Sequence, residues 1–546
     1  MHLTRYVVAC CVGSIFLATP TVANEPDPPA PPTLARDVPG IEFSRRLNAW
    51  NWPRDMRPLR QGVAAFYAGR SNAPIWTDDN GFNDRARAVI AELSKADDWG
   101  LRSSDYQAPA APADDPDARF DAELALTAAT LRYARDARGG RYDPNRLSLN
   151  IDRKPPILPP EQVLARLSAG EDAAAALKAL HPQHPQFEKL RQLYLQLRDA
   201  TPEQVATLTG IQQVVEDEPT KPRKSKTKSQ AKPDTDPKKI RARILYNMEM
   251  WRWMPERLGD YHITANVPEF KVRVMKDGKP LHTERVITGK VQNQTPLFSD
   301  EMEFVVFHPF WAVPDSIKVK ELLPGLVRGK NTISRQGLRA SYKGRDVDPY
   351  SVNWQMTDIR NFHIYQPPGR SNALGIVKFL FPNKHHVYMH DTPTKHLFKQ
   401  STRAFSHGCI RVRDPIRLAE ILLENDKGWS PERIKSIIAN GKEDNSITLD
   451  RKVPVHVTYF TAVVGDDGKP VFFRDIYGHE RLIQMGLDGK AHQIVLKKQK
   501  LDDLVGMNRG QVRTYDSGWG NWGGGGYSTS QSSGDRSWIR NAFNND

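Results

Sequence analysis

A lysine-rich stretch near the middle of the chain constrains the fold more than any other feature. From Lys221 to Lys239 the sequence is rich in lysine, proline, serine and threonine and has hardly any large apolar residue. Such a stretch cannot bury enough apolar surface to fold by itself. It therefore predicts a linker, over residues 201–242, between two separately folded parts. A basic run could also touch an anionic surface, but a solvated linker is favoured.

The parts on either side of the linker differ in the spacing of their apolar residues. Residues 40–200 repeat apolar side chains every three to four positions, as amphipathic helices do. Residues 243–485 instead alternate apolar and charged side chains, with Asp277-Gly278 as a hairpin turn signal between two such runs. We therefore predict an α+β multidomain protein, in which an α-helical domain precedes a mainly β domain. The helical part holds no obvious set of catalytic groups, so a structural or binding role is expected for it.

The two ends of the chain show neither pattern. The apolar run Tyr6–Leu17, followed by small residues at 21–23, predicts an export signal over residues 1–23. A membrane anchor that stays uncleaved is the alternative, and it would be the only membrane contact that the sequence predicts. Proline and acidic residues predict a disordered leader at 24–39, and a Gly-, Ser- and Asn-rich composition predicts a disordered tail at 505–546.

The balance of charge limits the kinds of partner. The chain has 546 residues and a formal net charge of +14, which favours polyanionic or carboxylate-rich partners. The arginines and lysines are scattered, and no nucleic-acid-binding motif accompanies them. No nucleic-acid partner is therefore predicted.

Cysteine usage draws attention to one residue. The chain has three cysteines, Cys10, Cys11 and Cys409, and removal of the signal would leave Cys409 alone. A lone cysteine in an exported protein forms no internal disulfide. It is either a buried free thiol that packs as a small apolar side chain or a reactive group. The neighbouring residues favour the reactive group.

The segment Ala404–Val412 has features that a nucleophilic cysteine needs. Gly408 permits a sharp turn just before Cys409. Backbone N–H groups of residues 407–409 would then face a substrate carbonyl oxygen as an oxyanion hole. The thiol also needs a base that removes its proton.

Two histidines are candidates for that base. His390 belongs to the strand-like segment 387–391, and a strand end holds an imidazole rigidly. His407 lies in the nucleophile's own turn, where substrate contact or fixing of that turn is its expected role. We favour His390 and expect its ring within hydrogen-bond reach of Cys409, closer than that of His407. A metal hydrolase built on these residues and His386 is disfavoured because no glutamate-bearing zinc motif accompanies them, and neither a metal nor a cofactor is predicted.

The spacing of these residues resembles the signature of the L,D-transpeptidase (YkuD-type) catalytic domain: His390 is followed, after a gap of fifteen residues, by Ser406-His407-Gly408-Cys409. Other segments resemble the larger Gram-negative members, which carry a helical scaffold domain and a capping subdomain. These segments are Asn247–Trp253, Gln294–Asp300, Gln366–Gly369, Asn372–Gly375 and Phe379–Asn383. The resemblance implies a scaffold domain at 40–200, a catalytic domain at 243–485 and a capping insertion at 316–372 with a mobile middle. Larger members often carry a peptidoglycan-binding module where this chain has its linker, so targeting to the wall needs another explanation.

The resemblance also implies roles for single residues. Cys409 is the nucleophile, His390 is the proton acceptor and donor, and Asp391 orients His390 through its backbone carbonyl. Gly408 and His407 form the turn and the oxyanion hole. The substrate-binding candidates are Arg411, Tyr388, Ser406 and His407. Arg411 would bind a carboxylate of the stem peptide, with a structural ion pair as an equally weighted alternative.

The activity implied by the resemblance is acyl transfer on peptidoglycan in the periplasm. Cys409 attacks the bond between the third residue of a stem peptide, a diamino acid, and the fourth, D-alanine. A thioester forms, and an amine of a second stem peptide resolves it into a 3→3 cross-link. Water or an amine of an outer-membrane protein could replace that acceptor, giving carboxypeptidase or anchoring activity. A papain-like or NlpC-type peptidase would place cysteine before histidine, against the order found here, and a non-enzymatic wall-binding scaffold is the remaining alternative.

Overall fold

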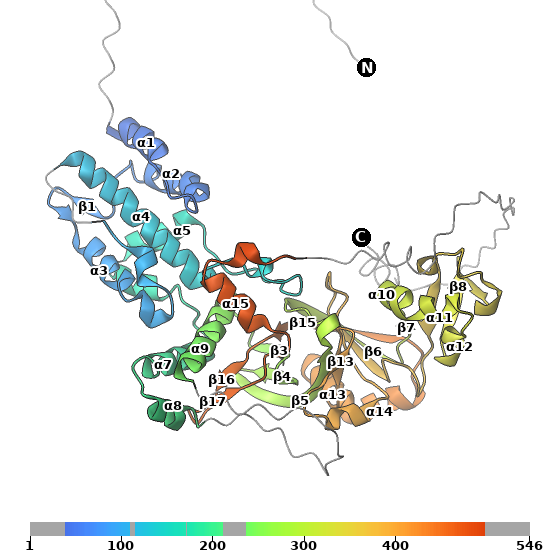
Figure 1. Ribbon diagram of the computed structural model, residues 1–546. Helices are drawn as coiled ribbons and strands as arrows, with labels where there is room; N and C mark the ends of the chain where they lie inside the picture. The colour runs from blue at the N-terminus through green and yellow to red at the C-terminus, as the bar shows by residue number, and fades with distance from the viewer. Residues whose placement is uncertain (1–38, 110–114, 171, 211–235, 497–546) are drawn as a thin grey trace, which may run out of the picture.

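The computed structural model describes residues 39–109, 115–170, 172–210 and 236–496. The predicted export signal, the leader up to residue 38, the middle of the predicted linker and the predicted C-terminal tail lie outside the described residues. A helical half and a sheet-rich half follow each other along the chain, which confirms the α+β class (Figure 1). Within the described residues, no helix is long and apolar enough to cross a membrane.

The helical half packs around one long helix, α4. Its elements are α1 (Pro39–Ala49), α2 (Arg60–Ala68), β1 (Thr77–Asp78), β2 (Gly81–Phe82), α3 (Asp84–Leu93), α4 (Pro116–Gly139), α5 (Pro160–Ala169) and α6 (Ala173–Lys178). Glu123 of α4 is fully buried, and its carboxylate accepts hydrogen bonds from the backbone N–H groups of Ile75 and Trp76. These elements share a hydrophobic core that extends from Leu47 to Leu180.

The next helix belongs to the sheet-rich half. Helix α7 (Pro185–Gln196) packs against α9 (Pro237–Arg252) and strand β16 (Ala462–Val464). Its residue Leu190 lies in the core of the sheet-rich half. The core of the helical half therefore ends near residue 180, and α7, which lies before the predicted boundary at residue 200, packs into the core of the sheet-rich half.

Both ends of the predicted linker are helical, so this part of the prediction is wrong. Helix α8 (Pro202–Thr209) begins with a capping box, in which the side chains of Thr201 and Gln204 each bind the backbone N–H of the other. Helix α9 begins at Pro237, where the carboxylate of Asp236 caps the first turn. Local capping overrides the polar composition at these two places.

The sheet of the second half closes on itself into a barrel. Its nine strands are hydrogen-bonded in the order β13-β5-β14-β12-β11-β6-β15-β3-β4, and β4 also pairs with β5. The strands are β3 (Tyr261–Asn266), β4 (Lys271–Lys276), β5 (Lys279–Gly289), β6 (Ser299–Phe307), β11 (Val377–Leu380), β12 (Met389–His390), β13 (Ala404–Ser406), β14 (Ile410–Val412) and β15 (Asn445–Thr458). The predicted turn joins β4 to β5, with Asp277 and Gly278 both at positive φ (49° and 76°).

Helices and a small hairpin cover the barrel. Helices α13 (Pro415–Lys427) and α14 (Pro431–Asn440) begin at the caps Asp414 and Ser430. After the barrel, β16 pairs with β17 (Pro470–Phe472), and α15 (His479–Leu487) packs beside α9. These elements contribute to one core with the barrel strands.

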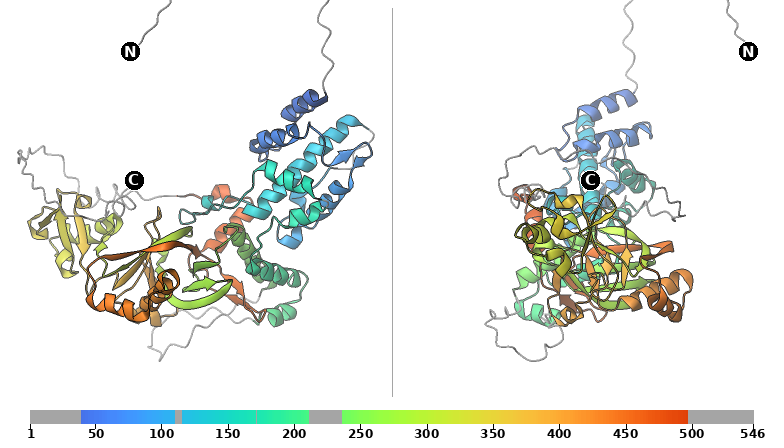
Figure 2. Two further views of the ribbon diagram at one scale, coloured as in Figure 1. Left: turned by 180° about the vertical axis from the view of Figure 1, so that it is seen from behind. Right: turned by 90° about the vertical axis from the view of Figure 1, so that its right-hand side faces the viewer.

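A separate lobe is inserted between β6 and β11. It contains β7 (Trp311–Ala312), α10 (Asp315–Ile317), α11 (Leu323–Val327), α12 (Thr332–Arg335), β8 (Arg339–Tyr342), β9 (Arg345–Val347) and β10 (His363–Gln366). Its four strands pair in the order β7-β10-β8-β9. Buried residues such as Leu322, Trp354 and Phe362 give it a hydrophobic core of its own. Figures 1 and 2 place this lobe at the opposite side of the barrel from the helical half.

Candidate active site

The register of two parallel strands brings the predicted catalytic residues together. Strand β12 pairs with β14 so that Met389 lies opposite Ile410 and His390 lies opposite Arg411. Side chains alternate between the faces of a sheet, and Met389 and Ile410 are fully buried. Tyr388, His390, Cys409 and Arg411 therefore share the other face. The rings of Tyr388 and His390 confirm this, since their centroids lie 5.6 Å apart.

The thiol of Cys409 is held by groups of the neighbouring chain segment. Its sulfur lies 3.7 Å from the backbone carbonyl oxygen of His386, and the neighbouring Tyr388 favours the thiolate to a smaller extent than burial disfavours it. His386 has a positive φ of 53°, a backbone conformation that is costly for residues other than glycine. Burial raises the pKa of the Cys409 thiol to about 11. The thiol is therefore protonated in the resting protein at neutral pH.

His390 is held in a defined orientation and is neutral. Its Nδ1 lies 2.5 Å from the backbone carbonyl oxygen of Asp391, the contact that the resemblance implies. Nδ1 must carry the proton to donate to this carbonyl, so Nε2 is left with a lone pair. Burial, together with the charges of Arg411 and Lys395, lowers the pKa of His390 to about 3. The ring is therefore an uncharged proton acceptor at neutral pH.

The expected hydrogen bond between His390 and Cys409 is absent among the contacts of the described residues. Among these residues His407 makes no such bond either. Its Nε2 lies 2.5 Å from a carboxylate oxygen of Glu321 and 3.3 Å from the amine of Lys290. Glu321 belongs to the inserted lobe, in the helical segment Lys318–Leu322. His407 thus connects the nucleophile's turn to this lobe.

The turn before Cys409 is stabilised by Ser406. The hydroxyl of Ser406 donates to the carbonyl oxygen of Cys409 (2.6 Å) and accepts from the N–H of Gly408 (3.1 Å). Gly408 has a φ of +122°, which favours glycine. In this structure the N–H of Gly408 is occupied by the Ser406 hydroxyl, so the predicted oxyanion hole would draw on the N–H groups of the neighbouring residues. The N–H groups of His407 and Cys409 have no hydrogen-bond partner within the described part of the chain.

The Ser406 hydroxyl has a structural use that the sequence did not predict. Ser406 is 2% exposed, and both of its hydrogen bonds go to the turn itself. Such a hydroxyl is not presented to a ligand. Its assignment as a substrate-binding residue is therefore disfavoured, and a role in shaping the turn is favoured.

Arg411 brings a positive charge to the same face. Its Nη1 donates to the hydroxyl of Thr394 (3.2 Å), and its Nε is buried without a partner. No carboxylate of the described residues forms an ion pair with it, so the structural ion pair is not observed. Burial lowers the pKa of Arg411 from its usual value. A partly unsatisfied guanidinium beside the thiol suits the binding of a carboxylate.

A segment of the helical half also contacts residues next to the site. The sequence contains no indication of this contact. Ile151 bridges to Leu297 as in a parallel sheet. The next residue, Asp152, binds the imidazole of His385 (2.8 Å) and the amine of Lys384 (2.9 Å). Lys384 and His385 directly precede His386, whose carbonyl oxygen accepts a hydrogen bond from the thiol. No local pattern could signal a contact between segments more than two hundred positions apart.

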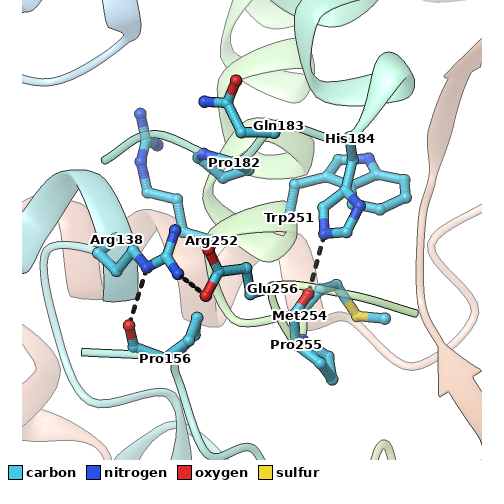
Figure 3. A pocket seen from close by; sticks show the side chains of 10 residues that line it. All are labelled: Arg138, Pro156, Pro182, Gln183, His184, Trp251, Arg252, Met254, Pro255 and Glu256. Carbon is cyan, nitrogen blue, oxygen red and sulfur yellow. Dashed lines mark hydrogen bonds and ion pairs between the residues drawn. The ribbon is translucent and has the colours of Figure 1, made fainter. Parts of the chain in front are cut away.

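A small cavity lies elsewhere, where the helical half meets α9 (Figure 3). Its wall includes Arg138, which forms an ion pair with Glu256 and donates to the carbonyl of Pro156 (3.0 Å). His184 on the opposite side lies 2.9 Å from the carbonyl oxygen of Pro255. None of the predicted site residues lines this cavity, so it belongs to the joint between the halves and not to the site around Cys409.

Comparisons with known proteins agree with the two halves. Residues 61–193 match a family model described as "Scaffold domain", and residues 260–455 match one described as "L,D-transpeptidase catalytic domain". A Haemophilus influenzae protein named "Putative L,D-transpeptidase" is 32% identical over 257 residues, which are 46% of this chain and 51% of that protein. The chain thus spans about half the length of this curated relative.

Two solved structures have been compared in the same way. An L,D-transpeptidase from Mycobacterium smegmatis is 13% identical, with 36% of this chain and 58% of that chain covered and a TM-score of 0.18. The structure titled "Structure of the Ldtfm-avibactam carbamoyl enzyme" is 14% identical, with 47% and 81% covered and a TM-score of 0.15.

Proposed function

We propose that the protein is a peptidoglycan L,D-transpeptidase with Cys409 as its nucleophile, because residues 260–455 match the family model of the L,D-transpeptidase catalytic domain. The observation that carries this proposal is the strand register that brings Cys409, His390 and Arg411 to one face. The scaffold match over residues 61–193 agrees with the wider resemblance to the larger members of the family.

The first half-reaction forms a thioester. Nε2 of His390 removes the thiol proton as the sulfur of Cys409 attacks the carbonyl carbon of the diamino acid in a donor stem peptide. A sulfur–carbon bond forms, and the carbonyl electron pair moves onto the oxygen. When that pair returns, the carbon–nitrogen bond to D-alanine breaks and His390 gives its proton to the departing amine.

This mechanism starts from a neutral pair. The pKa of the Cys409 thiol is raised to about 11 and that of His390 is lowered to about 3, so neither residue is charged before the donor binds. Proton transfer therefore accompanies the attack and does not precede it. The N–H groups of Cys409 and His407 are the available donors for the developing oxyanion, and Arg411 is placed to bind a donor carboxylate.

In the second half-reaction an amine attacks the thioester. The amine of a second stem peptide gives a 3→3 cross-link, and His390 takes its proton as the carbon–sulfur bond breaks. An amine of an outer-membrane protein or a water molecule would complete the same step with a different product. A periplasmic location follows from this substrate, and the predicted export signal agrees with it.

The inserted lobe and the helical half have supporting roles in this proposal. The lobe caps the cleft, which the contact between Glu321 and His407 supports. The helical half acts as a scaffold, which the contact of Asp152 with His385 supports. The division into a scaffold and a catalytic domain, with the boundary near residue 180, is supported by their two separate cores.

The proposal is tested with purified tetrapeptide stem substrate and mass spectrometry of the products. We expect release of D-alanine, a thioester adduct on the peptide that contains Cys409, and a product of two stem peptides joined through their third residues. The Cys409→Ala variant should give none of these. D-Alanine release by that variant would show that the nucleophile is wrong, while a tripeptide without any joined product would favour carboxypeptidase activity.

A further inference from the structure

A tyrosine from beyond the matched catalytic domain reaches the loops around the nucleophile. Tyr477 precedes α15 and is only 8% exposed. Its hydroxyl donates to the carbonyl oxygen of Gly289 (2.5 Å) and accepts from the backbone N–H of Thr295 (3.2 Å). Burial raises the pKa of Tyr477, so the hydroxyl keeps the proton that it donates. One side chain therefore ties together the two ends of the loop from Gly289 to Thr295.

Thr295 continues this contact to the turn that carries the nucleophile. It is fully buried, and its hydroxyl accepts from the N–H of Gly289 (2.9 Å) and donates to the carbonyl oxygen of Gly408 (2.8 Å). The backbone of the loop is tightly packed at Gly289, because a Cβ there would lie 2.0 Å from the carbonyl oxygen of Asn293. A displacement at either end would therefore reach the Gly408 carbonyl.

The carbonyl of Gly408 and the N–H of Cys409 belong to one peptide group. That group is planar and trans, so its C=O and N–H bonds point in opposite directions. The hydrogen bond from Thr295 to the carbonyl therefore fixes the direction of the Cys409 N–H. Within the described part of the chain this N–H has no hydrogen-bond partner, so it is available to a ligand.

Tyr477 is itself held from outside the barrel strands. Its backbone N–H donates to the hydroxyl of Tyr459 (2.6 Å), which donates to a carboxylate oxygen of Asp475 (2.8 Å). Asp475 in turn accepts the backbone N–H groups of His479 and Glu480 at the start of α15. The segment after the matched domain thus forms a support for the hydroxyl of Tyr477.

We propose that Tyr477, acting through Thr295, is a positioning residue that fixes the Gly408–Cys409 peptide group and so aims the Cys409 N–H at the oxyanion of the reaction. The inference rests on the proposed function, because the oxyanion arises only when Cys409 attacks a carbonyl. It adds a requirement that the catalytic motif does not contain: the segment after residue 455 takes part in shaping the oxyanion hole.

Two reactions of the same thiol separate this role from a general loss of structure. Acylation by the tetrapeptide donor passes through an oxyanion, whereas alkylation by iodoacetamide displaces iodide and forms none. The variants are Tyr477→Phe and Thr295→Val, which remove one hydroxyl each. Thr295→Ser keeps the hydroxyl. Tyr261→Phe is a matched control because, among the described residues, the hydroxyl of Tyr261 hydrogen-bonds only the carbonyl of Ile421 (3.5 Å).

We expect Tyr477→Phe and Thr295→Val to lower the acylation rate by about tenfold to a hundredfold, less than complete removal of an oxyanion donor costs. Alkylation of Cys409 should change by less than about threefold, and Thr295→Ser and Tyr261→Phe should behave as the wild type. An equal loss in both reactions, or no loss in either, would overturn the inference. If Tyr477→Phe fails to fold, the comparison of Thr295→Val with Thr295→Ser decides alone. A wild-type protein that is alkylated but never acylated would instead reject the proposed function, and the inference with it.

Discussion

The thiol of Cys409 hydrogen-bonds the backbone carbonyl of His386, at 3.7 Å, and not the imidazole of His390. A carbonyl oxygen can only accept, so the thiol keeps its proton in this arrangement. The pKa values agree, since that of the thiol is raised to about 11 and that of His390 is lowered to about 3. A thiolate–imidazolium pair would require the opposite order. The resting thiol and imidazole are therefore both uncharged, and substrate binding must bring His390 to the thiol.

The first prediction concerns the pH dependence of Cys409 alkylation. Because the thiol ionises only near pH 11, its reaction with iodoacetamide should accelerate about tenfold per pH unit from pH 6 to pH 9, without a plateau. The rate is measured on the peptide that contains Cys409 by mass spectrometry, which separates it from the other two cysteines of the chain. A plateau below pH 7 would reveal a preformed thiolate and contradict the neutral resting pair.

The second prediction separates the two histidines. His390→Ala should lower acylation by the tetrapeptide donor by roughly a hundredfold or more, because in the proposed mechanism Nε2 of His390 removes the thiol proton during the attack. Alkylation at pH 10 should change little, since hydroxide then ionises the thiol directly. His407→Ala is the matched variant and should retain most of the acylation rate. The assignment would be reversed if His407→Ala caused the greater loss.

Local sequence patterns predicted much of this fold, and the exceptions have physical reasons. The turn at Asp277-Gly278 was predictable because it depends on positive φ at adjacent residues. The helix start at Thr201 carried an equally local signal, a capping box, but the polar composition of the neighbouring segment obscured it. Strand β12 is only two residues long, too short for any periodicity, yet its pairing with β14 assembles the site.

The nucleophile and its base could be proposed from their residue types and spacing, but their surroundings could not. The carbonyl of His386 and the N–H of Cys409 are backbone groups, which every residue has. Glu321 lies 86 positions before His407, so only the folded chain brings the two together. The sequence therefore indicated which groups react, while the hydrogen bonds that aim them depend on tertiary packing.

The third prediction concerns the contact between Glu321 of the inserted lobe and His407. Both side chains are partly exposed, with 45% and 31% of their areas accessible, so their coupling should be modest, about 0.5–1 kcal/mol. Glu321→Ala should increase hydrogen exchange of the helical segment Lys318–Leu322. His407→Ala should have the same effect, and the double variant should add little to either. Fully additive effects of the two substitutions would show that the contact does not hold the lobe.

The fourth prediction concerns the charge of Arg411. Its positive charge lowers the pKa of the Cys409 thiol, so Arg411→Met should slow alkylation at pH 8 by about tenfold if one pKa unit is lost. Arg411→Lys keeps the charge and should stay close to the wild type in this reaction. Both variants should raise the KM for the tetrapeptide donor, because a lysine cannot bind a carboxylate in the bidentate manner of arginine. Equal slowing of alkylation by both variants would indicate that the bond to Thr394 matters and the charge does not.

The fifth prediction concerns acid stability and His479, which packs between Tyr459 and Tyr477. Both ring nitrogens of His479 are buried without a partner, and burial lowers its pKa to about 4. An unfolded histidine has a pKa of about 6.5, so between these values the unfolded chain binds a proton that the folded protein does not. This residue therefore costs stability progressively as the pH falls from 6.5 to 4.

Replacement of His479 by phenylalanine removes that proton binding. Between pH 8 and pH 5, the wild type should lose about 2 kcal/mol more unfolding free energy than His479→Phe does. This amount corresponds to a histidine pKa that folding lowers from 6.5 to about 4. Urea unfolding followed by tryptophan fluorescence at both pH values measures this shift. His492→Phe is the control, because His492 is exposed and its replacement should leave the pH dependence unchanged. The prediction fails if His479→Phe and the wild type lose the same stability on acidification, since the buried imidazole would then be protonated in the folded protein as readily as in the unfolded chain.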